Sequence, residues 1–188
     1  MSFRIIDGFL TKTYADFLEE KIGSHDQPWF YMNDSTDKGS PSNKLRSGEL
    51  PSYSFAYNIC SYERGMIDAP MSNMMLPFIH EIMDVLDCHQ LLRCRLDMTM
   101  QHPAGIIHTP HRDLKVPHVA CIYYVNDSDG DTVIYNEKRE SKKYTEMTRV
   151  SPTKNRLLIF DGDLFHTGHS PVKHRNRILI NTNFAIIS

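Results

Sequence analysis

The spacing of the apolar residues changes from helical to strand-like near Leu91, and this change limits the possible folds more than any other feature of the sequence. From that point, short runs of β-branched, aromatic and aliphatic residues alternate with polar turn segments, and no helical segment separates them. The runs are 91–101, 118–125, 132–135, 155–160 and 177–187, and three earlier candidate strands are 3–6, 29–32 and 53–59. A series of about eight such strands is typical of a sandwich or a jelly roll.

Two amphipathic helices are predicted in the first half of the chain. Residues 11–22 carry apolar side chains at helical spacing, begin at a threonine suited to an N-cap, and are followed by Gly23, a common helix stop. Residues 71–86 repeat apolar residues in the same way, and their methionines are interpreted as core filler rather than as a functional surface. We therefore predict a mainly β protein with flanking helices, in which the strands form a double-stranded β-helix, the core of jelly-roll and cupin-like folds.

The length of 188 residues suits one domain with a substantial core. We predict a single domain over residues 1–188, with a helical and strand-containing part over about residues 1–90 and the jelly-roll core over about 91–188. Between the two helices, residues 34–44 are polar and rich in Ser, Gly and Pro. This composition predicts a loop that becomes ordered when substrate binds.

The composition argues against several classes of protein. Hydrophobic residues make up 40% of the chain and charged residues 23%, as in soluble globular proteins, and no apolar run approaches the length of a membrane span. The N-terminus lacks the apolar core of a signal peptide, so a cytoplasmic location is expected. The four cysteines form no C-x-x-C pair, which argues against a zinc knuckle or a disulfide framework. A net charge of -2 argues against a protein built around a nucleic-acid backbone. The oligomeric state does not follow from the sequence.

Two polar segments of the second half each allow two interpretations. The segment D-S-D-G-D, residues 127–131, resembles the start of a calcium loop, but an EF-hand requires glycine and glutamate where this chain has Thr132 and Lys138. We interpret it as the tip of a hairpin. Residues 137–149 mix both signs of charge, so a solvated hairpin is favoured over a binding patch.

Part of the stretch H-T-P-H-R-D-L-K-V-P-H, residues 108–118, is a candidate metal site. His111 and Asp113 form the only H-x-D or H-x-E triplet of the chain, and a spacing of two places both side chains on one face of an extended strand. A chain with 10 histidines and 23 acidic residues is expected to contain about one such triplet by chance. The triplet therefore needs support from a second element.

The second element is the segment 155–184. A strand of apolar residues ends at Phe160, a turn at Asp161 and Gly162 leads to His166, and the next strand begins with an arginine. One carboxylate and two imidazoles on one face of an octahedral ion leave three positions open for a cosubstrate and O2, which is the arrangement in non-heme Fe(II) oxygenases. A jelly roll can bring two such distant strands together.

The order H-x-D, then F-D-G-x-x-x-H-x-G, then R-x-x-x-N-x-x-F resembles the 2-oxoglutarate and Fe(II)-dependent oxygenases, specifically their prolyl 4-hydroxylase-like branch. The motif C-I-Y-Y-V-N, residues 121–126, is similar to the corresponding strand of the oxygen-sensing prolyl hydroxylases. The segment I-D-G-F-L before the first helix also fits the way such domains often open. The resemblance covers about residues 91–184 well and the first 90 residues loosely.

The resemblance implies that His111, Asp113 and His166 are ligands of Fe(II). It implies that Arg177 pairs with the distal carboxylate of 2-oxoglutarate, a task that suits the planar fork of a guanidinium group. Tyr124 matches the second tyrosine of the related motif and is implied to donate a hydrogen bond to the same carboxylate, although a packed core aromatic fits this position equally well.

Two of these assignments have alternatives. His169 is the second candidate for the distal histidine. Arg175 has the same strand parity as Arg177, but it lies in a polar connection, whereas Arg177 opens an apolar run and is favoured for that reason. The other histidines of the region are interpreted as loop or rim residues, and with His169 they are His108, His118 and His174.

The implied function is that of a dioxygenase that couples oxidative decarboxylation of 2-oxoglutarate to hydroxylation of a C–H bond, with Fe(II), 2-oxoglutarate and O2 as its cofactor and cosubstrates. The expected substrate is a peptide, a protein or a small molecule, with a prolyl side chain as the family-level expectation and nucleic acid disfavoured by the charge. Two other classes remain open. One is a cupin-like metal-binding protein or isomerase that does not use 2-oxoglutarate, and the other is a non-enzymatic β-sandwich interaction protein.

Overall fold

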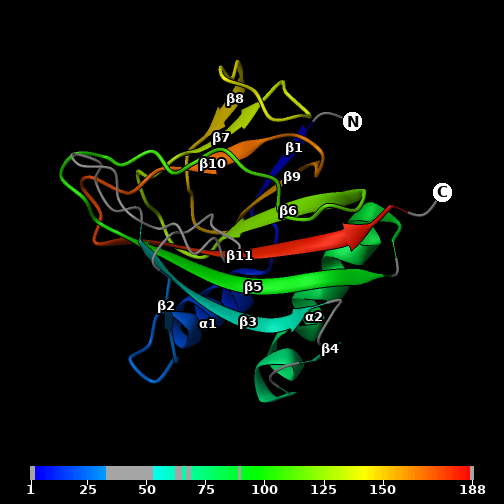
Figure 1. The fold of residues 1–188 in the computed structure, drawn as a ribbon. Coiled ribbons are helices and arrows are strands. Elements are labelled where there is room, and N and C mark those ends of the chain that lie inside the picture. The colour runs from blue at the N-terminus through cyan, green and yellow to red at the C-terminus, as the bar shows by residue number, and fades with distance from the viewer. Residues whose placement is uncertain (1–2, 33–52, 62–64, 67–68, 89, 187–188) are drawn as a thin grey trace.

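Two antiparallel sheets face each other in the structure, and two helices cover the outer face of the larger sheet (Figure 1). The computed structural model describes residues 3–32, 53–61, 65–66, 69–88 and 90–186. The predicted loop at 34–44 lies outside these residues. A mainly β fold with flanking helices and a jelly-roll core is confirmed, and its arrangement brings the two predicted site segments to the space between the sheets.

The larger sheet has eight strands among the described residues, and their order explains why distant segments meet. The path β1-β9-β6-β11-β5-β3-β2 places the C-terminal strand in the middle, with its neighbours drawn from both halves of the chain. The strands on this path are β1 (Phe3–Asp7), β9 (Arg156–Asp161), β6 (His118–Tyr124), β11 (Asn176–Ala185), β5 (Leu91–Met100), β3 (Ser54–Ser61) and β2 (Phe30–Met32), and β4 (Gly65–Met66) pairs with β3.

The smaller sheet contains three strands in the order β10 (His166–Gly168), β7 (Thr132–Tyr135) and β8 (Glu146–Val150). Only β7 was expected from the sequence. Strand β10 is too short to show a period, and β8 lies within the segment of mixed charge that was interpreted as a solvated hairpin. β7 and β8 do pair as an antiparallel hairpin, so that interpretation is confirmed for the backbone.

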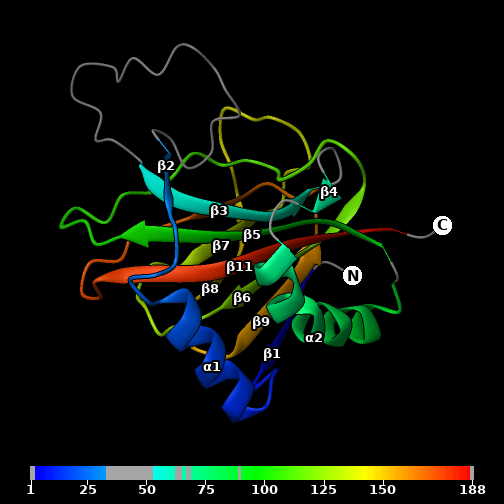
Figure 2. The same cartoon turned by 90° about the horizontal axis from the view of Figure 1, so that it is seen from below.

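Both helices pack their apolar sides against the larger sheet (Figure 2). Helix α1 (Lys12–Ile22) begins after Thr11 as predicted, but the threonine side chain makes no capping hydrogen bond. Helix α2 (Ala69–Leu86) begins two residues earlier than predicted, and its Met75 is fully buried, as expected of a methionine that fills the core. Neither described helix combines the length and apolar character that a membrane-spanning helix requires.

Successive side chains of strand β5 point to opposite faces of the larger sheet, and the residues on the two faces differ in character. Cys94 and Leu96 are fully buried in the core beneath the helices. Arg93, Arg95 and Asp97 point the other way, into the space between the two sheets. Because charged groups are costly to bury without partners, a face of this kind indicates a site rather than ordinary core packing.

The segment D-S-D-G-D is not the tip of a hairpin, and the prediction on this point is wrong. β6 pairs with β9 and β11, whereas β7 pairs with β8 and β10, so residues 125–131 cross from one sheet to the other. The carboxylate of Asp129 accepts hydrogen bonds from the backbone N–H groups of Val172, Lys173 and His174. These hydrogen bonds connect the crossing segment, residues 125–131, to residues 172–174, which lead into β11.

Candidate metal and cosubstrate site

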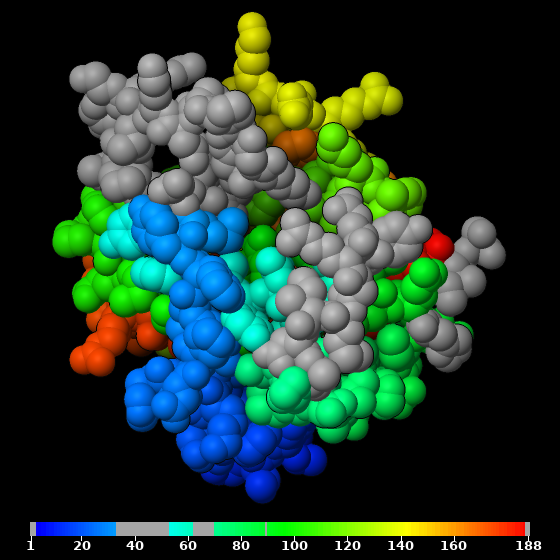
Figure 3. Space-filling model, turned by 60° about the horizontal axis from the view of Figure 1, so that its bottom comes forward, coloured from blue at the N-terminus to red at the C-terminus, as the bar shows by residue number. Residues whose placement is uncertain are grey.

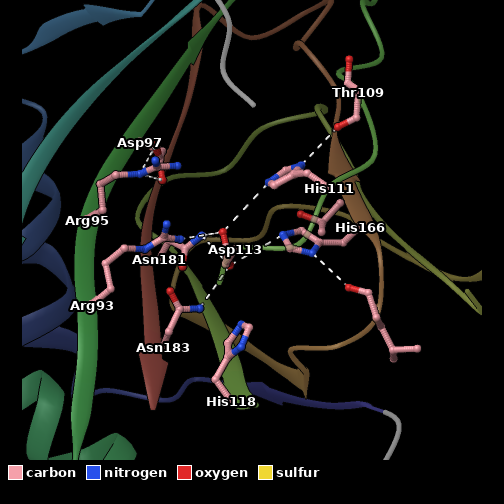
Figure 4. Close-up of polar contacts among 12 residues, drawn as sticks. Arg93, Arg95, Asp97, Thr109, His111, Asp113, His118, His166, Asn181 and Asn183 are labelled. Carbon is pink, nitrogen blue, oxygen red and sulfur yellow. Dashed lines mark hydrogen bonds and ion pairs between the residues drawn. The ribbon is translucent and has the colours of Figure 1, made fainter. Parts of the chain in front are cut away.

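His111, Asp113 and His166 converge between the two sheets, as Figure 4 shows. His111 and His166 form an isolated antiparallel bridge in which each backbone N–H donates to the other's carbonyl over 2.9 Å. Asp113 follows two residues later and points to the same side. One potential ligand atom from each of the three residues lies within 4.8 Å of the others, which is a spacing that a single metal ion could span.

The two imidazoles present the same nitrogen to the centre of this group. Nδ1 of His111 lies 3.1 Å from the carbonyl oxygen of Thr109, and Nδ1 of His166 lies 3.5 Å from that of Leu164. The Nε2 atoms lie 4.0 Å and 3.8 Å from the carboxylate oxygens of Asp113. An Nδ1–H that donates to a carbonyl leaves Nε2 unprotonated, as a metal ligand must be.

The electrostatic environment favours the protonation states that bind metal. Burial, reinforced by the neighbouring His166, lowers the pKa of His111 to about 3. Burial also lowers the pKa of His166. For Asp113, burial acts to raise the pKa, but Arg93 and the two histidines outweigh it and hold the pKa well below its usual range. At neutral pH the group therefore consists of two neutral imidazoles and one carboxylate.

Asp113 is held by three side chains from the larger sheet. Arg93 on β5 donates from Nη2 over 2.6 Å, and Asn183 on β11 donates from Nδ2 over 3.1 Å. The Nδ2 atom of Asn181 lies 3.2 Å from both carboxylate oxygens. Asp113 is 1% exposed, so its orientation is fixed by these contacts rather than by water.

Arg177 is a buried cation without an acidic partner. Its side chain is on β11, the residue is 5% exposed, and no ion pair to a carboxylate occurs among the described residues. Nη2 donates to Oγ1 of Thr132 over 2.6 Å, while Nε has no hydrogen-bond partner. A Cβ atom on Gly168 would lie 3.0 Å from Nη1, so the glycine leaves room around the guanidinium group.

Thr132 links Arg177 to Tyr124. Its Oγ1 accepts a hydrogen bond of 2.7 Å from the hydroxyl of Tyr124 as well as the one from Arg177. Thr132 contributes to the cavity lining, whereas Tyr124 is fully buried and does not. A threonine hydroxyl has one hydrogen and two lone pairs, so with both lone pairs engaged the hydrogen is left to donate to a ligand in the cavity.

A cavity of about 60 Å³ joins the histidines to this arginine. His111, His166, Thr132, Arg177 and Asn181 all contribute to its lining. The cavity therefore places a potential metal site and an uncompensated positive charge in one space, which an anion that also chelates the metal would fit.

The alternative residues lie elsewhere. His169 is not part of the convergent group, and Arg175 is exposed. His174 is exposed and contacts Asp129, as expected for a loop residue. His108 and His118 do not belong to the convergent group either, as expected. Neither lies on the rim, however: His108 is 3% exposed in a loop that lines the cavity, and His118 is 0% exposed at the start of strand β6.

Sequence reasoning missed three polar residues of this site. Arg93 orients Asp113, Thr132 contacts Arg177, and Arg95 lines the cavity while its Nε lies 2.9 Å from a carboxylate oxygen of Asp97. The alternation of charged and apolar residues in L-R-C-R-L-D could have indicated a polar site on one face of this strand. The same alternation is equally typical of a strand with one face in solvent.

The fold is a jelly roll, and the convergent group is a candidate metal site between its two sheets. Residues 98–185 match the model of the 2OG-Fe(II) oxygenase superfamily. This match spans 88 of the 188 residues, and it agrees with the resemblance found in the sequence. Two solved structures that share the fold hold such ligands: one is in complex with Fe3+ and alpha ketoglutarate, and the other has nickel and 2-oxoglutarate bound.

Solved structures share the fold at low sequence identity. A prolyl-4-hydroxylase from Pseudomonas putida is 13% identical with a TM-score of 0.62, and the match covers 100% of this chain and 94% of that one. A prolyl hydroxylase from Trichoplax adhaerens, in complex with a hypoxia inducible factor oxygen degradation domain peptide fragment, is 17% identical with a TM-score of 0.58, covering 97% and 83%. The epimerase SnoN, in complex with Fe3+, alpha ketoglutarate and nogalamycin RO, is 10% identical with a TM-score of 0.63, covering 97% and 78%. A search of curated proteins gave no match.

Proposed function

We propose that this oxygenase hydroxylates a side chain of a peptide or protein, with a prolyl residue as the first candidate. The observation that carries the proposal is one cavity lined by the histidines of the convergent group and by Arg177, a buried cation that has no carboxylate partner among the described residues. Two structural neighbours are prolyl hydroxylases, and one of them holds a peptide. These neighbours support a peptide substrate for this chain, and the residues of the cavity support the chemistry.

The residues present fit the metal and the cosubstrate. His111, Asp113 and His166 provide two imidazole nitrogens and one carboxylate, the ligand set of non-heme Fe(II) oxygenases. When bound, iron and 2-oxoglutarate supply the oxidation of the C–H bond by O2. The protein itself holds Asp113 in place through Arg93 and buries Asp113 and His166 between its sheets.

Arg177 and Thr132 are proposed to bind the distal carboxylate of 2-oxoglutarate. Arg177 offers the unpartnered Nε side of its guanidinium group, and Thr132 offers its hydroxyl hydrogen. Tyr124 is proposed to act on the cosubstrate through Thr132, because its hydroxyl bonds Thr132 rather than facing the cavity. This differs from the direct contact that the family resemblance implies.

The two alternative functions are less well supported. A cupin-like isomerase that does not use 2-oxoglutarate gives no role to a buried and uncompensated Arg177. A non-enzymatic interaction module gives no role to three buried or half-buried metal-binding groups within 4.8 Å of one another. A 2-oxoglutarate-dependent reaction other than hydroxylation remains a rival, because one neighbour with Fe3+ and alpha ketoglutarate is an epimerase.

The test has two stages. Calorimetric titration with Mn(II), a redox-inert substitute for iron, should show one site in the wild-type protein and none in Asp113→Ala, with His169→Ala as the matched control that retains the site. Proline-containing peptides and cell extract are then incubated with Fe(II), 2-oxoglutarate and O2, and mass spectrometry should show a product heavier by one oxygen atom. A stereochemical change without a gain of oxygen would indicate epimerisation instead.

A further inference from the structure

An open hollow of about 780 Å³ adjoins the candidate metal site. His111 lines both this hollow and the inner cavity, so the two spaces meet at a proposed iron ligand. The walls come from residues 110–112 and 114–115 around the H-x-D triplet, from residues 138–140 in the loop that connects β7 to β8, and from Phe165. The tip of the β7–β8 hairpin projects from the molecule and is drawn in yellow in Figure 3.

The walls of the hollow are predominantly basic. Four cationic side chains, Arg112, Lys115, Lys138 and Arg139, line it together with one acid, Glu140. The chain as a whole carries a net charge of -2, so this concentration of positive charge is opposite in sign to the rest of the protein. A concave surface lined by one sign of charge attracts ligands of the other sign and raises their local concentration.

Two of these cations are neutralised within the protein and two are not. Arg112 lies 3.4 Å from a carboxylate oxygen of Asp163, in the turn between β9 and β10, and Lys138 pairs with Asp161, the last residue of β9. No ion pair of Lys115 or Arg139 occurs in the part of the chain that the structure describes, and both side chains are exposed. Lys115 and Arg139 are therefore free to bind carboxylates from outside.

We propose that this hollow binds an acidic segment of a peptide or protein substrate, next to the residue that enters the metal cavity. The proposal rests on the function proposed above and specifies its substrate class. The cations come from two separate segments rather than converging on one point, which suits several carboxylates along a chain. Glu140 on the same wall disfavours an uninterrupted acidic run, so acidic residues alternating with neutral ones fit best.

A nucleic acid fits the hollow less well than an acidic peptide. Proteins that bind single strands combine positive charge with exposed aromatic rings on which bases stack. The aromatic residue of this hollow is Phe165, which is 6% exposed. Arg112 lies over its ring at 5.7 Å and the ring of Tyr144 lies 5.2 Å away, so no face is open for stacking.

The experiment measures fluorescence anisotropy with three labelled probes and the full-length protein. The probes are a short peptide of alternating glutamate and glycine, its lysine and glycine counterpart, and a short single-stranded oligothymidylate. The test variant is Lys115→Glu with Arg139→Glu. The matched control is Lys12→Glu with Lys21→Glu, two exposed lysines on α1, which lies on the other side of the larger sheet (Figure 1).

The glutamate peptide should bind the wild-type protein and the control, and the test variant should bind it at least about tenfold more weakly at low salt. No binding of this peptide, an equal loss in both double variants, or stronger binding of the oligothymidylate would each overturn the proposal. Circular dichroism must show both variants folded. The iron-dependent function is tested separately by Mn(II) titration of the wild-type protein. If no Mn(II) binds, the proposed function fails, but the peptide-binding measurement still tests the basic hollow independently.

Discussion

The guanidinium group of Arg93 lies 2.6 Å from a carboxylate oxygen of Asp113, and both side chains are almost completely buried. A metal ion bound at His111, Asp113 and His166 would share this carboxylate with Arg93. The arginine therefore has two opposing effects. It keeps Asp113 ionised and oriented, and it places a positive charge where a second positive charge is expected to bind.

We predict that Arg93→Leu destabilises the metal-free protein by about 3 kcal/mol, because removing one member of a buried ion pair leaves the other uncompensated. Saturating Mn(II) should reduce this loss, since the ion would supply the missing charge and stabilise the folded state by binding to it. Urea denaturation with and without Mn(II) measures both values. Arg95→Leu is the control on the same strand face, and an unchanged or larger loss in Mn(II) would contradict the prediction.

Arg177→Ala is predicted to lose 2-oxoglutarate binding. Removing one member of a desolvated charge pair typically costs about 3 to 5 kcal/mol, which corresponds to at least about a hundredfold loss of affinity. Arg175→Ala should have little effect, because Arg175 is exposed. The dependence of succinate formation on 2-oxoglutarate concentration distinguishes the two variants. The assignment fails if Arg175→Ala is the variant that loses this dependence.

The sequence predicted those residues of the candidate site whose relative positions follow from their spacing within one segment of the chain. The spacing of two in the H-x-D triplet predicted that His111 and Asp113 point to the same side, and the alternation of β11 places Arg177, Asn181 and Asn183 on one face. The strands of the second half were predicted for the same reason, since their apolar runs are long enough to show a period.

The remaining contacts of the site depend on tertiary pairing. Arg93 meets Asp113 only because the bridge between His111 and His166 of β10 places Asp113 opposite β5, and Thr132 meets Arg177 only because β7 lies in the opposite sheet. No local pattern specifies these neighbours. The same limit explains the error at residues 127–131, because turn residues look alike whether the chain returns to the same sheet or crosses to another.

Thr132→Val is predicted to weaken 2-oxoglutarate binding by about ten- to a hundredfold, because it removes a hydroxyl that we expect to donate to a carboxylate and that accepts from Arg177. Thr132→Ser keeps the hydroxyl and should bind nearly as well as the wild-type protein. Tyr124→Phe should have a smaller effect, since the hydroxyl that it removes contacts Thr132 and Arg177 and does not line the cavity. Calorimetric titration of 2-oxoglutarate into the Mn(II)-loaded variants measures all three, and equal affinities for Val and Ser would contradict the role of the hydroxyl.

Asp129 is predicted to make stability depend on pH in the acidic range. Burial acts to raise its pKa, but hydrogen bonds from His174 and from the backbone N–H groups of residues 172–174 lower it to about 2. Because an unfolded aspartate has a pKa of about 3.9, the folded state binds this proton less readily than the unfolded state. The stabilisation is therefore fully present above about pH 5 and is lost as the pH falls from about 4 to 2.

Asp129→Asn removes the charge and should lower the free energy of unfolding by about 1 kcal/mol at neutral pH, because hydrogen bonds to a charged acceptor are stronger than those to a neutral one. The gap between the variant and the wild-type protein should narrow as the pH falls from about 4 toward 2, because the carboxylate of the wild-type protein becomes protonated and loses its charge. Urea denaturation at several pH values measures the gap. Asp84→Asn, at an exposed position on α2, is the matched control and should unfold like the wild-type protein at neutral pH. A gap for Asp129→Asn that stays constant down to pH 2 would show that the carboxylate charge does not fasten the crossing segment to the connection before β11.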